Sequence, residues 1–298
     1  MADRFASPAA AGERLAATGY LTDATIDTVV YLADHLAKPV LVEGPAGVGK
    51  TELARAVATA RGAEIVRLSC YEGLDEAKAL YEWDYARQLL RITHARQAEG
   101  PSSWDDLEGD LFSEDYLLER PLLRALRHAD GAVLLIDEID KVDVEFEALL
   151  LEILADFQVT IPELGTVTAT VPPFVVLTSN RTRELSEALR RRCLYLHLDY
   201  PDRAREREIV LSHVPEAPVE LAEQIVRTVA NLRGLDLRKP PSIAETIDWA
   251  RTLVALAADH VDADTLAATL GVLVKLERDA ATVTGQLEAI APARKTAP

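Results

Sequence analysis

Short apolar runs alternate with amphipathic stretches through the first two thirds of the chain. A strand that is apolar along its whole length is buried on both faces, and the stretches between these runs have helical periodicity. The pattern therefore predicts an α/β fold with a five-stranded parallel sheet covered by helices. The five runs are residues 39–43 (PVLVE), 64–69 (EIVRLS), 132–138 (AVLLIDE), 174–180 (FVVLTSN) and 194–198 (LYLHL).

Two segments interrupt this alternation. Residues 70–130 form a long connection with helical patches and a turn-rich stretch, AEGPSSW. A connection of this length inside a compact domain usually carries function. Residues 157–171 (FQVTIPELGTVTATV) alternate apolar and polar positions around ELG, which predicts a β-hairpin.

The strands stop near residue 202, so the pattern divides the chain into an α/β domain over 18–202 and a separate helical subdomain over 203–280. Within the latter, Ser242 and Glu245 have the spacing of a capping box before an apolar helix. The ends, 1–17 and 281–298, are predicted to lack fixed structure, because small and polar residues dominate them.

The net charge and the cysteines disfavour several kinds of partner and site. The net charge of −17 disfavours nucleic acid as a general partner, because phosphate backbones are bound by basic patches. Cys70 and Cys193 are far apart and in no CxxC pair, so neither a disulfide framework nor a zinc site is expected. There is no signal-peptide core at the start and no run of about eighteen apolar residues, so a cytoplasmic protein without a membrane span is expected.

The stretch GPAGVGKT follows the first apolar run and fits a phosphate-binding loop, GxxxxGK followed by Ser or Thr. The glycines allow backbone N–H groups to approach phosphate oxygens, and the next helix adds its positive N-terminal end. Lys50 is expected to reach the β- and γ-phosphates of ATP, and Thr51 to supply a hydroxyl to Mg²⁺. A plain strand–helix turn is disfavoured because both the strand and the helix are present. The nucleotide-binding residues are Gly44, Pro45, Ala46, Gly47, Val48, Gly49, Lys50, Thr51 and the helical Glu52.

Two further runs end in polar side chains. Asp137 and Glu138 end the run of residues 132–138, where Asp137 can hold Mg²⁺ through water and Glu138 can orient the attacking water. Asn180 closes the next run and can hold the γ-phosphate and that water. For each of these residues the alternative is an ordinary polar loop after a core strand. This alternative is disfavoured because the three residues together complete one magnesium–nucleotide site.

Arg190, Arg191 and Arg192 follow a short apolar helix pattern. One of them is expected to stabilise transition-state charge on a neighbouring subunit's ATP, and the other two to form a solvated helix end that is favourable for the helix dipole. Tyr20 and Leu21 could pack on an adenine base, but ordinary core contacts are the favoured interpretation.

The order of these parts resembles an AAA+ ATPase. The hairpin and the long connection resemble the MoxR branch, and several stretches resemble its CoxD-like members: KPVLVEGPAGVGKTELA, LSCYEGLDEAKALYEW, ERPLLRAL, LLIDEIDKVDVEFEALLLEIL, LTSNRTRELSEALRRRCLYLHLDYP and RKPPSIAETIDWA. The resemblance covers roughly residues 18–280. It implies a P-loop core, a helical lid over 203–280 and a ring, commonly a hexamer, with ATP at subunit interfaces.

The resemblance also assigns roles. Lys50 and Thr51 match Walker A, Asp137 and Glu138 match Walker B, Asn180 matches sensor 1, and Arg192 best matches the arginine finger because Cys193-Leu194 follows it. Lys239-Pro240-Pro241-Ser242 stands where the family places its sensor-2 arginine, and Arg238 is the nearest candidate. MoxR proteins often act with a von Willebrand factor A domain protein and activate metalloenzymes. CoxD-like members are linked to the molybdenum–copper site of carbon monoxide dehydrogenase.

The favoured hypothesis is an oligomeric Mg-ATPase that remodels a protein partner, with a metalloenzyme as its client. A nucleic-acid motor or loader is the alternative, which the acidic balance disfavours. A small-molecule kinase is a third class, but it would act as a monomer and would need neither Asn180 nor an arginine from a neighbour.

Overall fold

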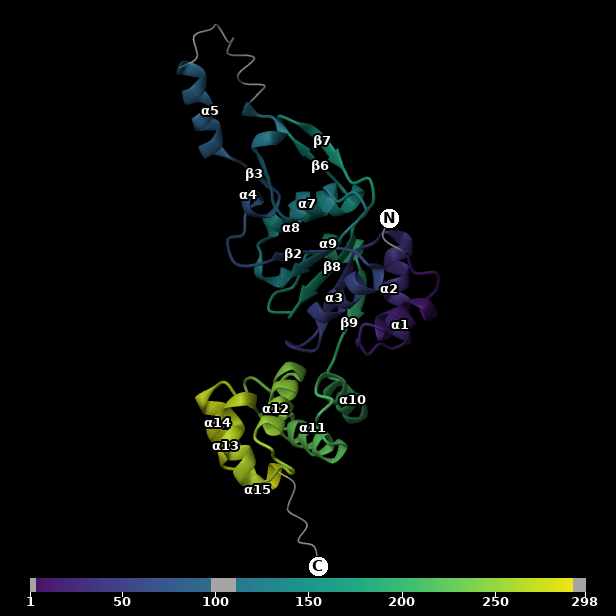
Figure 1. Cartoon of the computed structure of the whole chain (residues 1–298), viewed down its shortest axis with the longest axis vertical. Helices are drawn as coiled ribbons and strands as arrows, with labels where there is room; N and C mark the ends of the chain where they lie inside the picture. Colours follow the sequence, from purple (N-terminus) through teal and green to yellow (C-terminus); the bar gives the residue numbers. More distant parts are fainter. Residues whose placement is uncertain (1–3, 98–110, 292–298) are drawn as a thin grey trace, which may run out of the picture. The chain divides into compact units, whose positions relative to one another are not determined.

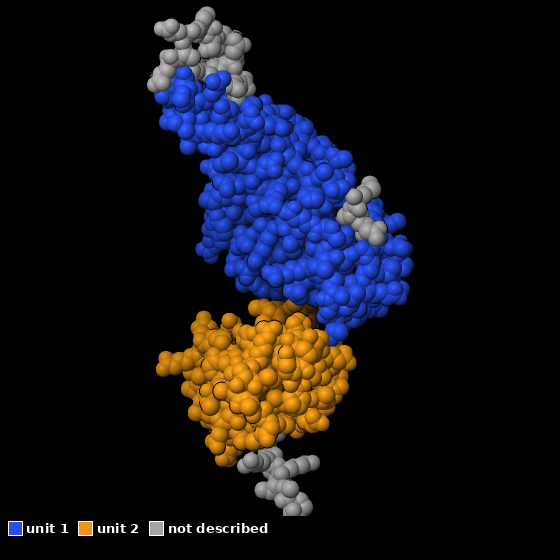
Figure 2. Space-filling model, in the orientation of Figure 1, with its two compact units in different colours: residues 1–44, 50–197 blue, residues 45–49, 198–298 orange. Residues whose placement is uncertain are grey.

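The computed structural model describes residues 4–97 and 111–291. The chain divides into two compact units (Figure 2). The first comprises Met1–Gly44 and Lys50–His197, and the second comprises Pro45–Gly49 and Leu198–Pro298. No helix in the described part of the chain is both long enough and apolar enough to cross a membrane.

A five-stranded, wholly parallel sheet forms the centre of the first unit (Figure 1). The three inner strands are buried at every position, because helices cover both faces of an apolar parallel sheet. This confirms the predicted α/β class and all five strands. In spatial order they are β2 (Ile65–Ser69), β5 (Val133–Asp137), β8 (Phe174–Ser179), β1 (Val40–Glu43) and β9 (Leu194–His197).

Several helices of the first unit begin at side-chain caps that the sequence supplies. Asp23 caps α2 by accepting from the backbone of Thr25 and Ile26, and Asp143 caps α8 in the same way. Helix α3 packs against β2, β5 and β8, whereas α2 packs against β1 and β9. The helices are α1 (Pro8–Ala16), α2 (Ala24–Leu36), α3 (Lys50–Arg61), α7 (Pro121–Arg127), α8 (Val144–Asp156) and α9 (Glu187–Arg192).

Helix α1 occupies a segment that the sequence predicts to be disordered. The prediction for 1–17 is wrong over Pro8–Ala16, where Ser7 caps the helix and Leu15 is fully buried. Helix α1 packs on α2, and a Cβ at Gly12 would collide with the carboxylate of Asp27. The small residues of α1 permit close helix packing. A flexible chain has the same composition, so composition alone does not distinguish the two.

The long connection of residues 70–130 contains more structure than helical patches. Strand β3 pairs antiparallel with β4, a two-stranded sheet that the sequence does not predict. The AEGPSSW turn starts at residue 98 and lies outside the described residues. The described elements are α4 (Glu76–Ala79), β3 (Tyr81–Trp83), α5 (Tyr85–Gln97), η1 (Glu114–Tyr116) and β4 (Leu117–Glu119).

The second interruption is the expected hairpin. Strand β6 (Gln158–Ile161) pairs antiparallel with β7 (Gly165–Thr168), and Gly165 turns the chain with a φ of +86° that favours glycine.

The second unit is helical, as the sequence predicts, around a core that includes the fully buried Trp249. Ser242 and Glu245 form the expected capping box. The prediction of a flexible tail is wrong over residues 281–291, because Val283 and Ile290 are buried in this core. The helices are α10 (Arg203–His213), α11 (Val219–Arg233), α12 (Ile243–Ala255), α13 (Ala263–Leu273), α14 (Glu277–Thr284) and α15 (Leu287–Ile290).

Candidate functional site

Three neighbouring strands bring separate sequence motifs to one edge of the sheet. Strands β5, β8 and β1 are adjacent and parallel, so their carboxyl ends lie together. Strand β1 runs into the glycine-rich loop, β5 ends at Asp137, and β8 ends directly before Asn180. This edge is where open α/β sheets bind ligands.

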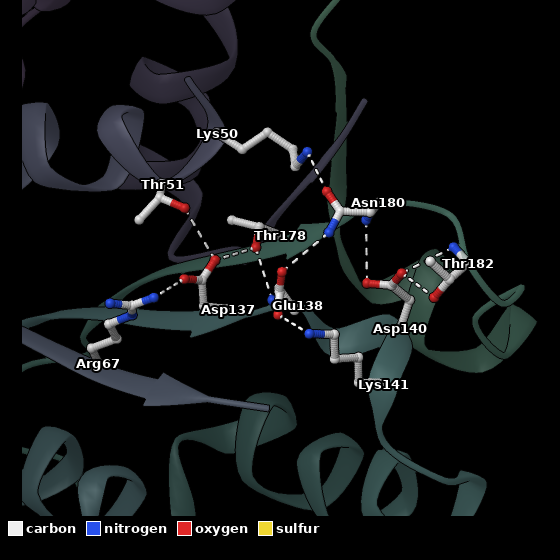
Figure 3. Close-up of polar contacts among 10 residues, drawn as sticks. All are labelled: Lys50, Thr51, Arg67, Asp137, Glu138, Asp140, Lys141, Thr178, Asn180 and Thr182. Carbon is white, nitrogen blue, oxygen red and sulfur yellow. Dashed lines mark hydrogen bonds and ion pairs between the residues drawn. The ribbon is translucent and has the colours of Figure 1, made fainter. Parts of the chain in front are cut away.

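Lys50 begins α3 and reaches back across the edge (Figure 3). Its Nζ donates to the carbonyl oxygen of Gly44 over 2.7 Å and to Oδ1 of Asn180 over 2.8 Å. Burial lowers the pKa of Lys50 below its usual value, while the nearby carboxylates, led by Asp140, act in the opposite direction. The loop before it needs glycine, because Gly47 and Gly49 have φ values of +73° and +98°.

Asp137 is buried, and every polar atom of its carboxylate has a donor. Oδ1 accepts from the hydroxyls of Thr51, over 3.1 Å, and Thr178, over 2.6 Å. Oδ2 accepts from the guanidinium of Arg67 over 2.5 Å. A hydroxyl and a carboxylate side by side are the hard oxygen ligands that Mg²⁺ prefers, so Thr51 and Asp137 fit this ion.

Glu138 has a left-handed backbone, with φ of +60° and ψ of 48°. Such a conformation costs about 1–3 kcal/mol in a residue with a side chain and is common at active sites. Its N–H donates to Oγ1 of Thr178 over 2.9 Å, which holds the turn in place. Its carboxylate accepts from Nδ2 of Asn180 over 3.3 Å and pairs with Lys141, so the strained turn directs it toward Asn180 (Figure 3).

Asp140 fixes the backbone beyond β8, a role that the sequence analysis missed. It accepts from the N–H of Asn180 over 3.2 Å and from both the N–H and the hydroxyl of Thr182, over 2.9 Å and 2.5 Å. Burial is the largest single influence and would raise the pKa of Asp140, but the hydrogen bonds from Thr182 and Asn180 together lower it. Asp140 is therefore an anionic anchor for Asn180.

A second missed cluster joins the end of β1 to the residue after Asn180. Glu43 is 5% exposed and accepts from Nε of Arg181 over 2.8 Å and from the hydroxyl of Tyr195 over 3.1 Å. Arg181 also has a left-handed backbone, with φ of +60°. The start of the glycine-rich loop and the end of β8 are thus tied together by an ion pair.

The predicted arginines lie on α9 and in the second unit. Arg192 ends α9 and is exposed, whereas Arg191 pairs with Glu187 and the guanidinium of Arg190 lies 5.9 Å from the ring centre of Tyr195. Arg238 lies in the second unit, where its N–H donates to the buried Asp279 over 3.0 Å. Tyr20 and Leu21 are half-buried.

A P-loop at the edge of a parallel sheet, facing paired carboxylates and an amide, defines a nucleotide-hydrolysing protein. The family model described as ATPase family associated with various cellular activities (AAA) matches residues 40–198, which is more than half of the chain. The chain belongs to this family, so it is an ATPase that uses ATP and Mg²⁺.

Individual proteins and solved structures are similar to this chain over most of its length. The chain is 26% identical over 230 residues to the uncharacterized protein SH1500 of Staphylococcus haemolyticus, covering 75% of this chain and 78% of that protein. It is 30% identical over 207 residues to the gas vesicle ATPase GvpN of Haloferax mediterranei, covering 66% of this chain but only 57% of GvpN. Among solved structures, a RuvB mutant of Thermotoga maritima has a TM-score of 0.50 and 22% identity, over 89% of this chain and 73% of that one, which shows the fold alone.

Proposed function

We propose that the residues at the carboxyl ends of β1, β5 and β8, namely Lys50, Thr51, Asp137, Glu138 and Asn180, form the ATP-hydrolysing site. The observation that carries this proposal is the bridge made by Asn180, whose amide contacts both Lys50 and Glu138. A group that must position both the γ-phosphate and the attacking water needs such a place between a cation and a carboxylate. When bound, Mg²⁺ neutralises charge on the phosphate oxygens.

Each residue has a separate task in this site. Lys50 and the backbone N–H groups of the loop Gly44–Thr51 bind the phosphates, with Glu52 in the first turn of α3. Thr51 and Asp137 hold the metal ion through oxygen. Glu138 and Asn180 orient the water, because phosphoryl transfer depends on positioning and electrostatics more than on covalent chemistry.

The site is complete only in a ring, most simply a hexamer. Arg192 is exposed at the end of α9, where it can reach the ATP of a neighbouring subunit. Arg238 serves as sensor 2 of the lid, and its loop is held by the buried Asp279. Both assignments rest on the motif positions together with this exposure and anchoring.

The ring remodels a protein partner in the cytoplasm. Support comes from the long insertion, where Tyr85, Leu89 and Leu90 of α5 are each more than 60% exposed, and from the β6–β7 hairpin. The resemblance to MoxR and CoxD-like proteins names the partners: a von Willebrand factor A domain protein and an immature metalloenzyme. A nucleic-acid motor is disfavoured by the charge of −17.

Two variants test the chemistry of this site. Lys50→Ala should lose nucleotide binding, and Glu138→Gln should bind ATP but hydrolyse it about a hundredfold more slowly, because the water loses the carboxylate that polarises it. Phosphate release and binding of a fluorescent ATP analogue measure the two effects. Hydrolysis by Glu138→Gln at the wild-type rate would remove Glu138 from the mechanism.

The remodelling role is tested with the same variants. Glu138→Gln protein loaded with Mg-ATP is used to capture partners from native lysate, with Lys50→Ala as the matched control. ATP-dependent capture of a von Willebrand-type protein or an immature metalloenzyme is expected. Capture dominated by nucleic acid, with retention that falls steeply as salt increases, would favour the motor instead.

A further inference from the structure

Arg67 on strand β2 contacts the carboxylate of Asp137, the proposed metal ligand at the end of the neighbouring strand β5. It lies on β2 opposite Leu135 of β5, two residues before Asp137. Its guanidinium extends along the sheet edge to Oδ2 of Asp137 at 2.5 Å (Figure 3). The side chain of Arg67 is 50% exposed, whereas that of Asp137 is 7% exposed. A half-exposed cation therefore contacts a buried anion.

The position of this cation matters because of what else Asp137 contacts. Its other oxygen, Oδ1, already accepts from the hydroxyls of Thr51 and Thr178. A divalent ion held by Thr51 and Asp137 would thus approach a carboxylate that carries a guanidinium. Two cations within a few ångströms repel one another, and most strongly where little water screens them.

We propose that Arg67 is a positioning residue of the metal site, which neutralises Asp137 until a divalent cation displaces it. When no divalent ion is bound, the guanidinium keeps a buried carboxylate paired, which would otherwise be costly. Arg67 can leave because its side chain is half-exposed and a long flexible side chain loses little by turning to water. Arg67 thereby sets the concentration of Mg²⁺ that the site requires.

An exposed ion pair at the other end of β2 provides a matched control. Arg124 of α7 pairs with Glu64, which directly precedes β2, and both side chains are exposed, at 58% and 42%. Replacing Arg124 by glutamine removes the same charge from the same unit without touching Asp137. Lysine at position 67 keeps the charge and tests for rescue.

The first experiment measures Mn²⁺ affinity in the presence of ADP, from the electron paramagnetic resonance signal of free Mn²⁺. Arg67→Gln should bind Mn²⁺ about fivefold more tightly than wild type, a factor appropriate to a half-exposed ion pair. Arg67→Lys should remain near wild type, and Arg124→Gln should not differ from it. A purely structural arginine would give unchanged or weaker Mn²⁺ binding in Arg67→Gln.

The second experiment follows thermal unfolding with and without metal. In EDTA, Arg67→Gln should melt about 2–4 °C below wild type, because Asp137 loses its partner. With Mn²⁺ and ADP the difference in melting temperature should disappear, because the metal ion then pairs with Asp137 in place of the arginine. An equal deficit under both conditions would overturn the proposal.

The inference rests on Asp137 being a metal ligand, as proposed above, and Asp137→Asn separates the two ideas. If Asp137→Asn binds Mn²⁺ like wild type, both the metal assignment and the role of Arg67 fall. If Asp137→Asn loses Mn²⁺ while Arg67→Gln binds it with wild-type affinity, the metal site stands and only the role of Arg67 falls.

Discussion

The side-chain oxygen of Asn180 accepts a hydrogen bond from the ammonium group of Lys50 over 2.8 Å, although 130 residues separate them in the sequence. The nitrogen of the same amide donates to Glu138 over 3.3 Å. One planar group thus links the phosphate-binding cation to the carboxylate that orients water. Its two ends cannot move independently, so the amide couples the position of Lys50 to that of Glu138 while both hydrogen bonds are made.

Asn180→Ala should lower kcat about a hundredfold and leave nucleotide affinity within a few fold, because the amide acts on the reacting groups more than on binding. Phosphate release and binding of a fluorescent nucleotide measure the two quantities. Asn231→Ala is the matched control, since it removes an amide that donates to Ile290 in the second unit. A similar loss of kcat in both variants would contradict the role of Asn180.

Asp140→Asn should reduce the free energy of unfolding by about 2 kcal/mol at pH 7, because buried donors lose their anionic acceptor. The folded-state pKa of Asp140 is lowered, so its contribution is complete above the ordinary value of 3.8 and is lost as the pH falls through the folded-state pKa. Urea titrations of both proteins should therefore differ equally at pH 5 and pH 7. The difference should shrink below pH 3.8, and exposed Asp156→Asn is the control.

Arg181→Ala should destabilise the protein, because among the described residues buried Glu43 then keeps only the Tyr195 hydroxyl as a side-chain donor. The loss should be modest for a buried carboxylate because Arg181 itself is half-exposed. Arg191→Ala, which breaks an exposed pair with Glu187 one helical turn away, should cost less than about 0.5 kcal/mol. Urea denaturation measures both, and equal losses would show that burial of Glu43 does not matter.

Arg192→Ala should lower kcat about a thousandfold without weakening ATP binding, as expected for an arginine that contacts only the transition state of a neighbour. Mixing this variant with Lys50→Ala protein should restore part of the activity, because a ring then pairs an intact P-loop with an intact arginine. Arg191→Ala should hydrolyse ATP normally. Activity that does not recover on mixing would exclude an arginine supplied from a neighbouring subunit.

Neither cysteine should react in the folded protein. Burial, followed by the nearby charge of Asp137, raises the pKa of Cys70 to about 12, and burial raises that of Cys193 to about 12. Since the thiolate is the reactive form, a disulfide reagent at pH 8 should titrate both thiols in urea and neither in native protein. Rapid reaction of one native thiol would show that its surroundings open readily.

The sequence revealed the parts of the site that depend on local pattern. Continuous apolar runs marked β1, β5 and β8, and the glycine-rich loop and the terminal polar residues marked the edge. Arg67, Asp140 and the Glu43–Arg181 pair were missed because their partners lie on other strands or in the loop after β8. Those contacts depend on the order β2-β5-β8-β1-β9, which no local pattern encodes.

The errors in the fold have equally local causes. Strands β3 and β4 are three residues long each, which is too short for a period of two to be recognised. The composition around α1 suits both a flexible tail and a helix that packs closely. The same ambiguity affected the last helices, α14 and α15.

Helix α1 has a practical consequence for anyone who shortens this chain. Trimming by composition would remove everything before residue 18, and with it the bond from Nε of Arg14 to the carbonyl of Ala60, over 3.0 Å, near the end of α3. It would also remove the hydrogen bond from the Phe5 N–H to the carboxylate of Asp34. That carboxylate forms a buried ion pair with Arg61. Such a truncated protein should be less stable than the full chain, because it lacks these contacts. Lys50 lies at the other end of α3, so a loss of hydrolysis in the shortened chain would not by itself identify a defect in the phosphate-binding loop.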